Sequence, residues 1–317
     1  HIFNPKWFDK PTDSQITVIC PLPLYHIFAL TAHTFALFYH GAKNVLITNP
    51  RDLPTFVGTL KKQKFHVMSG VNTLFEALLN NEDFRKLDFS NFIGALSGGM
   101  ATLPSTAEKW EKVTGTVLLQ AYGLTETSPL VTSMEYDSPA FTGSIGKAAL
   151  FTEVEVRDDS GQILPIGQAG ELCIRGPQVM QGYWKTEDSG VDANGWFNSG
   201  DIATIDEAGY VHIIDRKKDM IIVSGFNVYP NEVEAVVSEH PAVMECGCIG
   251  VEDEKSQEVV KVFVVVHEGQ NLSSEELIAF CRDNLTAYKV PKLVEFISEL
   301  PKSNVGKVLR RELKDLH

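Results

Sequence analysis

Long apolar runs, a surplus of positive charge and paired cysteine motifs are all missing from this chain of 317 residues. No apolar stretch approaches the roughly 20 residues that a membrane-spanning helix requires. The formal net charge of −13 argues against a nucleic-acid-binding protein, because such a protein needs a basic surface to displace phosphate counterions. A small polyanion is still an acceptable ligand, since a few local lysines and arginines are enough to bind it.

Cysteine is also scarce, with five residues and no C-x-x-C pair. Four of the five lie in apolar stretches, which indicates buried, reduced thiols and predicts a cytoplasmic enzyme. Cys246 and Cys248 are separated by a single glycine. We interpret them as alternate positions of a strand rather than as a redox or metal site, because no other Cys or His residues cluster with them.

Residues 1–140 alternate short apolar runs with amphipathic stretches. The runs predict strands at 16–20, 45–48, 65–69, 93–97 and 117–121, and the stretches predict helices at 25–40, 54–64, 73–80 and 104–114. This alternation is typical of an α/β domain with a mainly parallel sheet covered by helices. Ligands of such sheets bind beyond the carboxyl ends of the strands. Two loops occupy that position, 98–100 and 122–126.

Residues 141–214 show short alternating strands separated by turn signals, which predicts a small antiparallel barrel-like subdomain or twisted sheet. A charged segment, 215–218, follows as the predicted domain boundary. Residues 219–317 mix strands with helices and predict a compact α+β domain of about 100 residues. In that domain one helix follows Pro230, and another follows Ser273, which forms a predicted capping box with Glu276.

The loop that ends in Thr125 and Glu126 places a hydroxyl beside a carboxylate, next to Gly123. A phosphate ester with Mg²⁺ needs this pairing, because the hydroxyl donates to a phosphate oxygen and the carboxylate holds the hard cation. The glycine allows a ligand to approach closely. On these residues alone, an ordinary helix start, with Thr125 as the cap, is an equally good interpretation.

Two further positions suggest nucleotide chemistry. Asp201, in the motif Gly195-Trp-Phe-Asn-Ser-Gly-Asp201, is able to accept both hydroxyls of a ribose, with Arg216 beside it to offset phosphate charge. The alternative is an ordinary ion pair across a sheet. Lys307 follows a glycine near the end of the chain, and a flexible turn there would present its ammonium to a transition state. Alone, such a lysine is usually only solvated.

Together these motifs resemble those of the adenylate-forming superfamily, which contains acyl-CoA synthetases, luciferases and the adenylation domains of peptide synthetases. The resemblance covers essentially the whole chain and depends on four motifs in order: 122–126, the Asp201 motif, 215–230 and the Gly-Lys turn at Lys307. Stretches 46–52, 70–75, 176–180 and 300–307 are similar to a bacterial long-chain fatty-acyl-CoA synthetase in particular.

The resemblance implies a role for each motif residue. The nucleotide site would comprise Gly98 and Gly99 lining the adenine and acyl pockets, Tyr122 packing on adenine, Thr125 on the α-phosphate, Glu126 on Mg²⁺, Asp201 on the ribose and Arg216 on ribose and phosphate. Lys307 would bridge the carboxylate and the α-phosphate. The acyl substrate would contact His26 and Gly123, and CoA would pass Ser224 and Gly225. Lys218 matches the hinge position about which the C-terminal domain rotates, so the resemblance also implies that 215–218 is a hinge and that the domain 219–317 is mobile.

The implied reaction is ligation of a long-chain fatty acid to coenzyme A with ATP and Mg²⁺, through an acyl-adenylate. Fatty acid, ATP or AMP, and CoA are the implied partners, and nucleic acid is not. A homodimer and a peripheral contact at the inner face of the cytoplasmic membrane stay open. The rival interpretations are an adenylate-forming ligase for aryl, short-chain or amino acids, and a noncatalytic module that binds AMP or acyl-CoA.

One departure from the superfamily is plain. Its Ser/Thr/Gly-rich phosphate loop with a lysine, upstream of the segment containing His26, has no counterpart here. The chain begins at His1 and its first methionine is Met68. We therefore expect a fragment of a longer protein that by itself forms no acyl-adenylate, since the missing loop wraps the β- and γ-phosphates.

Overall fold

The computed structural model describes residues 15–187, 189–303 and 306–316. Its contacts divide the chain into two units, one made of His1–Ser199 with Thr204–His212 and the other of Gly200–Ala203 with Ile213–His317. The boundaries expected at residues 140, 214 and 218 stay predictions.

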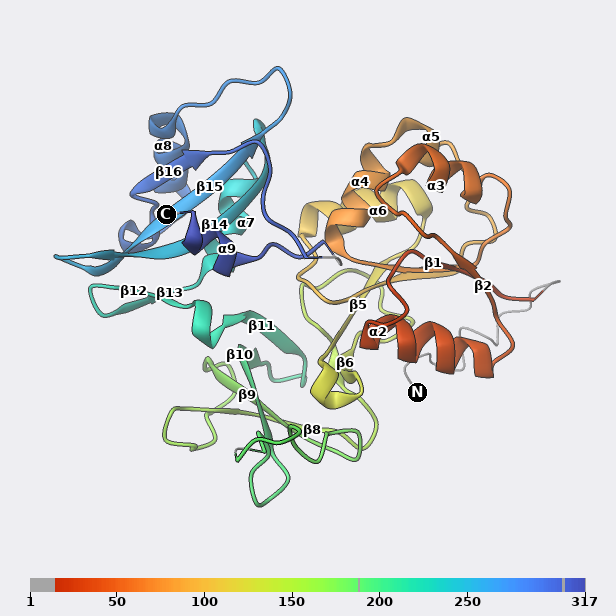
Figure 1. Ribbon diagram of the computed structural model, residues 1–317, viewed down its shortest axis with the longest axis horizontal. Helices are drawn as coiled ribbons and strands as arrows, with labels where there is room; N and C mark the ends of the chain where they lie inside the picture. Colours follow the sequence, from red (N-terminus) through yellow and green to blue (C-terminus); the bar gives the residue numbers. More distant parts are fainter. Residues whose placement is uncertain (1–14, 188, 304–305, 317) are drawn as a thin grey trace. The chain divides into compact units, whose positions relative to one another are not determined.

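The first unit is built on a seven-stranded sheet of order β2-β1-β3-β4-β5-β6-β7 (Figure 1). The strands are β1 (Thr17–Cys20), β2 (Lys43–Leu46), β3 (Val67–Gly70), β4 (Gly94–Ser97), β5 (Leu118–Gly123), β6 (Leu130–Ser133) and β7 (Lys147–Ala148). The pairs among β1 to β5 are parallel, while β6 and β7 pair antiparallel. The mainly parallel α/β sheet is confirmed, and β6 and β7 were not predicted.

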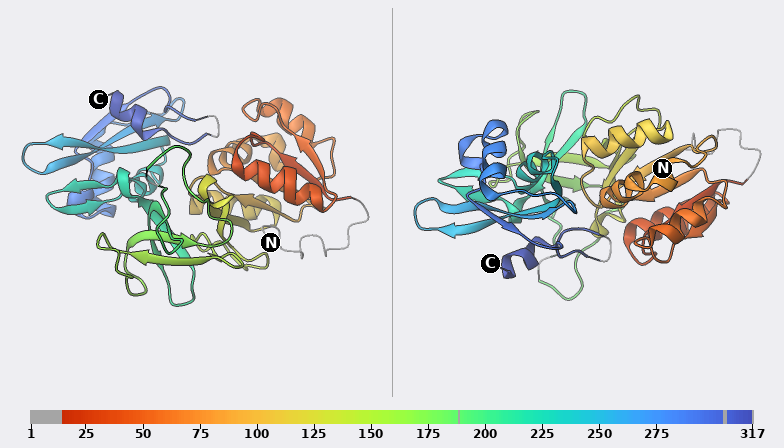
Figure 2. Two further views of the ribbon diagram at one scale, coloured as in Figure 1. Left: turned by 60° about the horizontal axis from the view of Figure 1, so that its bottom comes forward. Right: turned by 90° about the horizontal axis from the view of Figure 1, so that it is seen from above.

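Alternate residues of these strands enter two different cores, because successive side chains of a strand point to opposite faces. Ile19 and Met68 pack with one set of helices, and Val18 and Val67 pack with the segment around Leu37. The first set consists of α3 (Leu53–Leu60), α4 (Asn72–Asn80), α5 (Glu82–Arg85) and α6 (Pro104–Thr114). Figures 1 and 2 show these helices on one side of the sheet and α2 on the other.

The helix expected at 25–40 differs from the prediction. It begins as α2 (Ile27–Ala29) and continues as a π-helix, Leu30–Leu37. The segment buries Ala32, His33 and Leu37 and leaves the aromatic rings of Phe35, Phe38 and Tyr39 exposed, and its sequence gives no local signal for the wider turn. The strand expected at 45–48 is also displaced. It runs from Lys43 to Leu46 and is partly exposed rather than buried.

A second sheet contains β8 (Glu153–Arg157), β9 (Gly170–Arg175), β10 (Phe197–Ile205) and β11 (Val211–Arg216), in the order β11-β10-β9-β8. The pair β8 and β9 is antiparallel. Of the two forms that the sequence predicted here, the structure therefore has the sheet. Strands β10 and β11 carry residues of both units.

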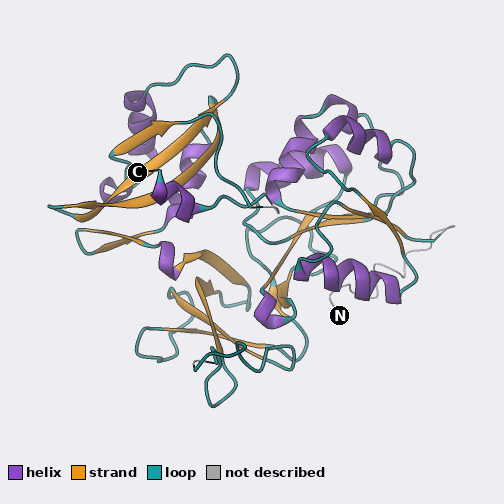
Figure 3. Cartoon of the chain, in the orientation of Figure 1, coloured by secondary structure: helices purple, strands orange, loops and turns teal. Residues whose placement is uncertain are grey.

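The second unit carries a sheet of order β13-β12-β15-β14, with β16 paired to β15 (Figure 3). Its elements are β12 (Ile221–Val223), β13 (Phe226–Val228), α7 (Pro230–Ser238), β14 (Val243–Asp253), β15 (Gln257–Val266), α8 (Ser274–Asn284), β16 (Leu293–Phe296) and α9 (Arg310–Asp315). Helices α7 and α8 pack on one face, and α9 packs on the other through Leu313. The capping box of Ser273 and Glu276 is confirmed.

The five cysteines are free thiols, and all except the half-buried Cys246 are buried. Burial raises the pKa of Cys20 and Cys281 to about 11 each, so these thiols are largely protonated and unreactive near neutral pH. Cys246 and Cys248 occupy alternate positions of β14, as predicted. Within the described part of the chain, no helix is both long and apolar enough to cross a membrane.

Candidate functional site

Two loops of the first unit meet at the carboxyl ends of neighbouring parallel strands. Strand β4 pairs with β5 in the register Ser97 to Gln120, so the loop that begins at Gly98 lies beside the end of β5. A narrow pocket forms here with a free volume of about 40 Å³. Its lining includes five residues singled out from the sequence: His26, Gly98, Gly99, Tyr122 and Gly123.

His26 reaches this pocket from the N-terminus of α2. Its Nδ1 accepts a hydrogen bond from the backbone N–H of Phe28 at 3.3 Å, which places the proton of the neutral ring on Nε2. Burial lowers the pKa of His26 below its ordinary 6.5. At neutral pH the ring is therefore an uncharged donor at the edge of a mainly apolar pocket.

The glycine at position 123 is required for a different reason from the one expected. A Cβ atom placed there would lie 1.9 Å from the carbonyl oxygen of Pro129. That space is filled by the chain's own backbone, where β5 turns into β6. Close packing of this turn, rather than the approach of a ligand, therefore requires glycine at position 123.

The predicted phosphate-contacting pair forms a single 3₁₀ turn, Thr125–Thr127. Its N-cap is Leu124, so the alternative in which Thr125 caps a helix is wrong. The buried Thr127 holds the turn, because its Oγ1 accepts from the Leu124 N–H at 3.1 Å and donates to the Pro129 carbonyl at 2.5 Å. Thr125 is left exposed and Glu126 half-buried.

Glu126 has a neighbour that the sequence did not reveal. The Tyr183 hydroxyl donates to its Oε1 at 2.9 Å, and its backbone carbonyl accepts from the N–H of Met180 at 2.8 Å. These contacts join segments more than fifty residues apart, and no local pattern marks Tyr183. A cation held by Glu126 would therefore share this carboxylate with the Tyr183 hydroxyl.

The donor atoms around Glu126 fit an Mg²⁺ ion that takes only some of its ligands from the protein. Within the described ranges, no group of three or more His, Cys, Asp or Glu side chains is placed to hold a metal. Mg²⁺ is commonly bound through one or two carboxylates, waters and the phosphates of a substrate. One carboxylate beside the exposed hydroxyl of Thr125 matches that mode.

In the second unit, Asp201 and Arg216 lie on the neighbouring strands β10 and β11. Asp201 is buried, and its Oδ1 lies 3.6 Å from Nε of the partly exposed Arg216. A buried carboxylate is costly unless it is paired, and Arg216 supplies a partner whose side chain is 39% exposed. The pair therefore combines a buried acceptor with a partly exposed cation.

Lys307 joins this pair from far along the chain. Its turn is closed by Ser303, whose N–H donates to the Lys307 carbonyl at 2.8 Å and whose Oγ accepts from the Lys307 N–H at 3.2 Å. Burial, together with the charge of Arg216, lowers the pKa of Lys307 from its ordinary 10.5 to about 8, and Asp201 acts in the opposite direction. Lys307 is thus half-buried within electrostatic range of Arg216 and Asp201 rather than fully solvated.

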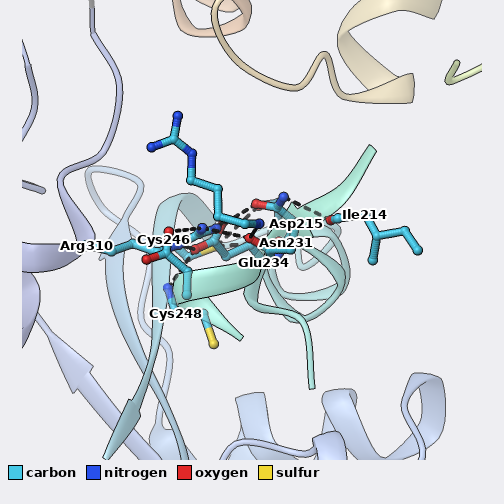
Figure 4. Close-up of polar contacts among 10 residues, drawn as sticks. Ile214, Asp215, Asn231, Glu234, Cys246, Cys248 and Arg310 are labelled. Atoms are coloured by element: carbon cyan, nitrogen blue, oxygen red, sulfur yellow. Dashed lines mark hydrogen bonds and ion pairs between the residues drawn. The ribbon is translucent and has the colours of Figure 1, made fainter. Parts of the chain in front are cut away.

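Arg310, three residues after Lys307, lies in a polar network that the sequence did not predict (Figure 4). Arg310 donates to Asp215 at 3.1 Å and to Asp219 at 3.3 Å. It also donates to Asn231 at 2.6 Å and to Glu234 at 2.8 and 3.1 Å. The partners lie 76 to 95 residues away along the chain, so no local pattern identifies them.

The residues expected to face CoA form the turn between β12 and β13. Ser224 has φ +51° and Gly225 has φ +83°, the left-handed pair that a two-residue hairpin requires. A Cβ atom at Gly225 would meet no atom within 4 Å, so there is open space beside this residue. Lys218, the expected hinge residue, lies in a 3₁₀ turn, Lys217–Asp219.

Comparison with known protein families identifies the class of protein to which this chain belongs. The family model described as AMP-binding enzyme matches residues 3–184, and the model of the AMP-binding enzyme C-terminal domain matches 232–307. The chain belongs to the AMP-binding enzyme family.

Individual proteins agree with this assignment. A long-chain-fatty-acid–CoA ligase of Yersinia pestis is 55% identical over 94% of this chain and 53% of its own length. ATP-bound MatB from Rhodopseudomonas palustris is similar with a TM-score of 0.87 and 32% identity, over 95% of this chain and 60% of its own. The anthranilate CoA ligase AuaEII with anthranoyl-AMP has a TM-score of 0.87 and 27% identity, over 95% of this chain and 60% of its own. The chain spans about half the length of the curated relatives it matches.

Proposed function

We propose that the protein to which this chain contributes ligates a long-chain fatty acid to coenzyme A through an acyl-adenylate. The observation that carries the proposal is the grouping in the second unit of a buried carboxylate, Asp201, with Arg216 and the partly desolvated Lys307. A ribose needs the carboxylate as acceptor, and an α-phosphate under attack needs the cations.

In the proposed adenylation step, the fatty-acid carboxylate attacks the α-phosphate of ATP and pyrophosphate leaves. Lys307 contacts both the carboxylate and the α-phosphate, and its ammonium balances the charge that develops between them. Thr125 donates a hydrogen bond to a phosphate oxygen. The protein does little covalent work, so its contribution is orientation and charge stabilisation.

In the second step, the CoA thiolate attacks the acyl carbonyl and AMP leaves. The exposed turn of Ser224 and Gly225 is the proposed passage for the pantetheine chain. A side chain at position 225 would project into the open space beside this turn and would obstruct the passage. Mg²⁺, held by Glu126 and the phosphates, would supply charge neutralisation while ATP is bound. Rotation about Lys218 between the two steps is part of the proposal.

The long-chain preference is supported by the name and the 55% identity of the Yersinia pestis relative. In the first unit, Tyr122 is proposed to pack on adenine, and Gly98, Gly99 and His26 to line the passage to the acyl chain. The pocket that these residues line has a free volume of about 40 Å³, far below the roughly 300 Å³ of a usual ligand pocket. Its lining side chains must therefore move apart when an acyl group enters.

Calorimetric titration of this chain with a nonhydrolysable palmitoyl-adenylate analogue tests the proposal. We expect saturable binding that is at least tenfold weaker in Asp201→Asn, because the lost charge removes an ionised ribose acceptor worth over 1.4 kcal/mol. The same titration with benzoyl- and acetyl-adenylate analogues tests the aryl and short-chain acids of the rival interpretation. Tighter binding of either than of the palmitoyl analogue would replace the long-chain assignment.

Catalysis is tested separately by ATP–pyrophosphate exchange with palmitate. We expect none from the 317-residue chain, and measurable exchange would contradict that expectation. A cytoplasmic location, peripheral contact with the inner membrane face and a homodimer stay predictions of the proposal.

A further inference from the structure

Arg310 is the centre of the most extensive polar network in the described part of the second unit. The residue is 15% exposed at its side chain and contacts three carboxylates, of which Asp215 is fully buried. Burial raises the pKa of both Asp215 and Glu234 above their ordinary values. A single arginine thus holds together acidic groups that would otherwise be expensive to bury.

The network also ties several elements to one point. Asp215 is the second-to-last residue of β11, Asp219 lies in the turn after it, and Asn231 and Glu234 lie on α7, while Arg310 begins α9. The Glu234 carboxylate additionally accepts from the N–H of Cys248 on β14 at 2.8 Å. These partners flank the predicted hinge residue Lys218 on both sides.

A buried network of this kind is weak evidence for stability, because apolar residues of similar volume often stabilise a protein equally well. Its distinctive property is geometry, since the planar guanidinium fork admits few orientations. Only Val308 and Leu309 separate Arg310 from Lys307. The hydrogen bonds that fix Arg310 therefore also restrict the position of the turn that contains Lys307.

We propose that Arg310 is a positioning residue that holds the Lys307 turn against Asp201 and Arg216. The inference rests on the proposed function, in which Lys307 must meet the reacting groups at a set place. Arg310 itself touches no reacting atom in this scheme. Its five-donor fork, rather than its charge alone, performs the positioning.

The experiment measures the ionisation of Lys307 in the full 317-residue chain by competitive acetylation across pH, read by peptide mass spectrometry. The charged groups that act on Lys307 are Arg216 on β11, Asp201 on β10, Arg310 on α9 and Asp219 in the turn after β11. We expect a wild-type midpoint of about 8. No substrate is needed, so a failed adenylate-analogue titration would reject the proposed function without affecting this result.

The decisive variant is Arg310→Lys, which keeps the positive charge and loses the fork. If Arg310 positions the turn, then in this variant Lys307 moves toward water and the midpoint of its titration rises by at least one pH unit. The neutral fraction of Lys307 at pH 8 then falls about fivefold. A midpoint that stays near 8 overturns the proposal. The matched control is Arg311→Lys on the exposed face of the same helix, which should leave the midpoint unchanged.

Folding is monitored in the same samples by alkylation of the buried thiols Cys248 and Cys281. If Arg310→Lys exposes them, Asn231→Ala takes its place, because it removes an uncharged partner that lies 2.6 Å from Arg310. We then expect a smaller rise of the Lys307 midpoint with the thiols still protected. An unchanged midpoint in that variant would equally reject the positioning role.

Discussion

Replacing Lys307 by methionine should stabilise the second unit near neutral pH, although the residue is proposed to be essential for adenylation. The folded protein keeps the ammonium partly away from water, which lowers its pKa to about 8 from an ordinary 10.5. Between these two values the unfolded chain binds more protons than the folded chain, so stability rises with pH across that window. Below pH 8 the full cost of the buried charge applies.

The size of the effect follows from the same pKa values. At about 1.4 kcal/mol per pH unit, the shift from 10.5 to about 8 corresponds to an upper value of ~3 kcal/mol. Lys307 is only half-buried, and water screening reduces the cost. We therefore expect Lys307→Met to raise the free energy of unfolding by about 1–2 kcal/mol at pH 7, with the gain vanishing above pH 10.5.

The assay is urea unfolding at pH 7, 9 and 10.5, with a short alkylation pulse that reports exposure of Cys248 and Cys281. Variant and wild type are compared at each pH, so the intrinsic reactivity of the thiols cancels. Lys314→Met, at an exposed position of α9, is the control and should change stability by less than about 0.5 kcal/mol. A gain that is absent at pH 7, or equal at every pH, would refute the argument that Lys307 is held at a cost.

Five further variants test the local structure of the site and its surroundings, each by thermal or urea unfolding. Gly123→Ala places a Cβ 1.9 Å from a backbone oxygen and should cost about 3 kcal/mol or more. Gly58→Ala, in a helix with no atom within 4 Å, should instead gain about 0.5–1 kcal/mol; similar effects for the two would count against the packing argument. Thr127→Val should cost about 1–3 kcal/mol through lost hydrogen bonds, while Thr127→Ser should keep most of the stability. Ser273→Ala should cost about 0.5–2 kcal/mol, and no loss would mean that the capping box is not formed in solution.

The order of elements in this protein could be predicted from local patterns. Apolar runs of four or five residues separated by amphipathic stretches predict parallel strands and helices, because side-chain period and burial are properties of neighbouring residues. The same holds for the capping box at Ser273 and for the two loops at Gly98 and Tyr122. A parallel sheet then places both loops at one edge, so part of the candidate site also follows from the sequence.

Other features depended on contacts that no local pattern contains. The π-helical form of Leu30–Leu37, the displaced and exposed strand β2, and the strands β6 and β7 reflect packing between segments. The reason for glycine at 123 became visible only when Pro129 was seen to occupy the space of its Cβ. Tyr183 contacts Glu126 from a loop with no motif of its own.

The sequence alone determined which chemical groups are present: a carboxylate at 201, an arginine at 216 and a lysine after a glycine at 307. Only the tertiary structure decided that Lys307 is partly buried within electrostatic range of the other two, and that Arg310, three residues further on, is fixed by four partners. The physical reason is that electrostatic effects depend on distance and desolvation, which arise when segments far apart in the chain exclude water together.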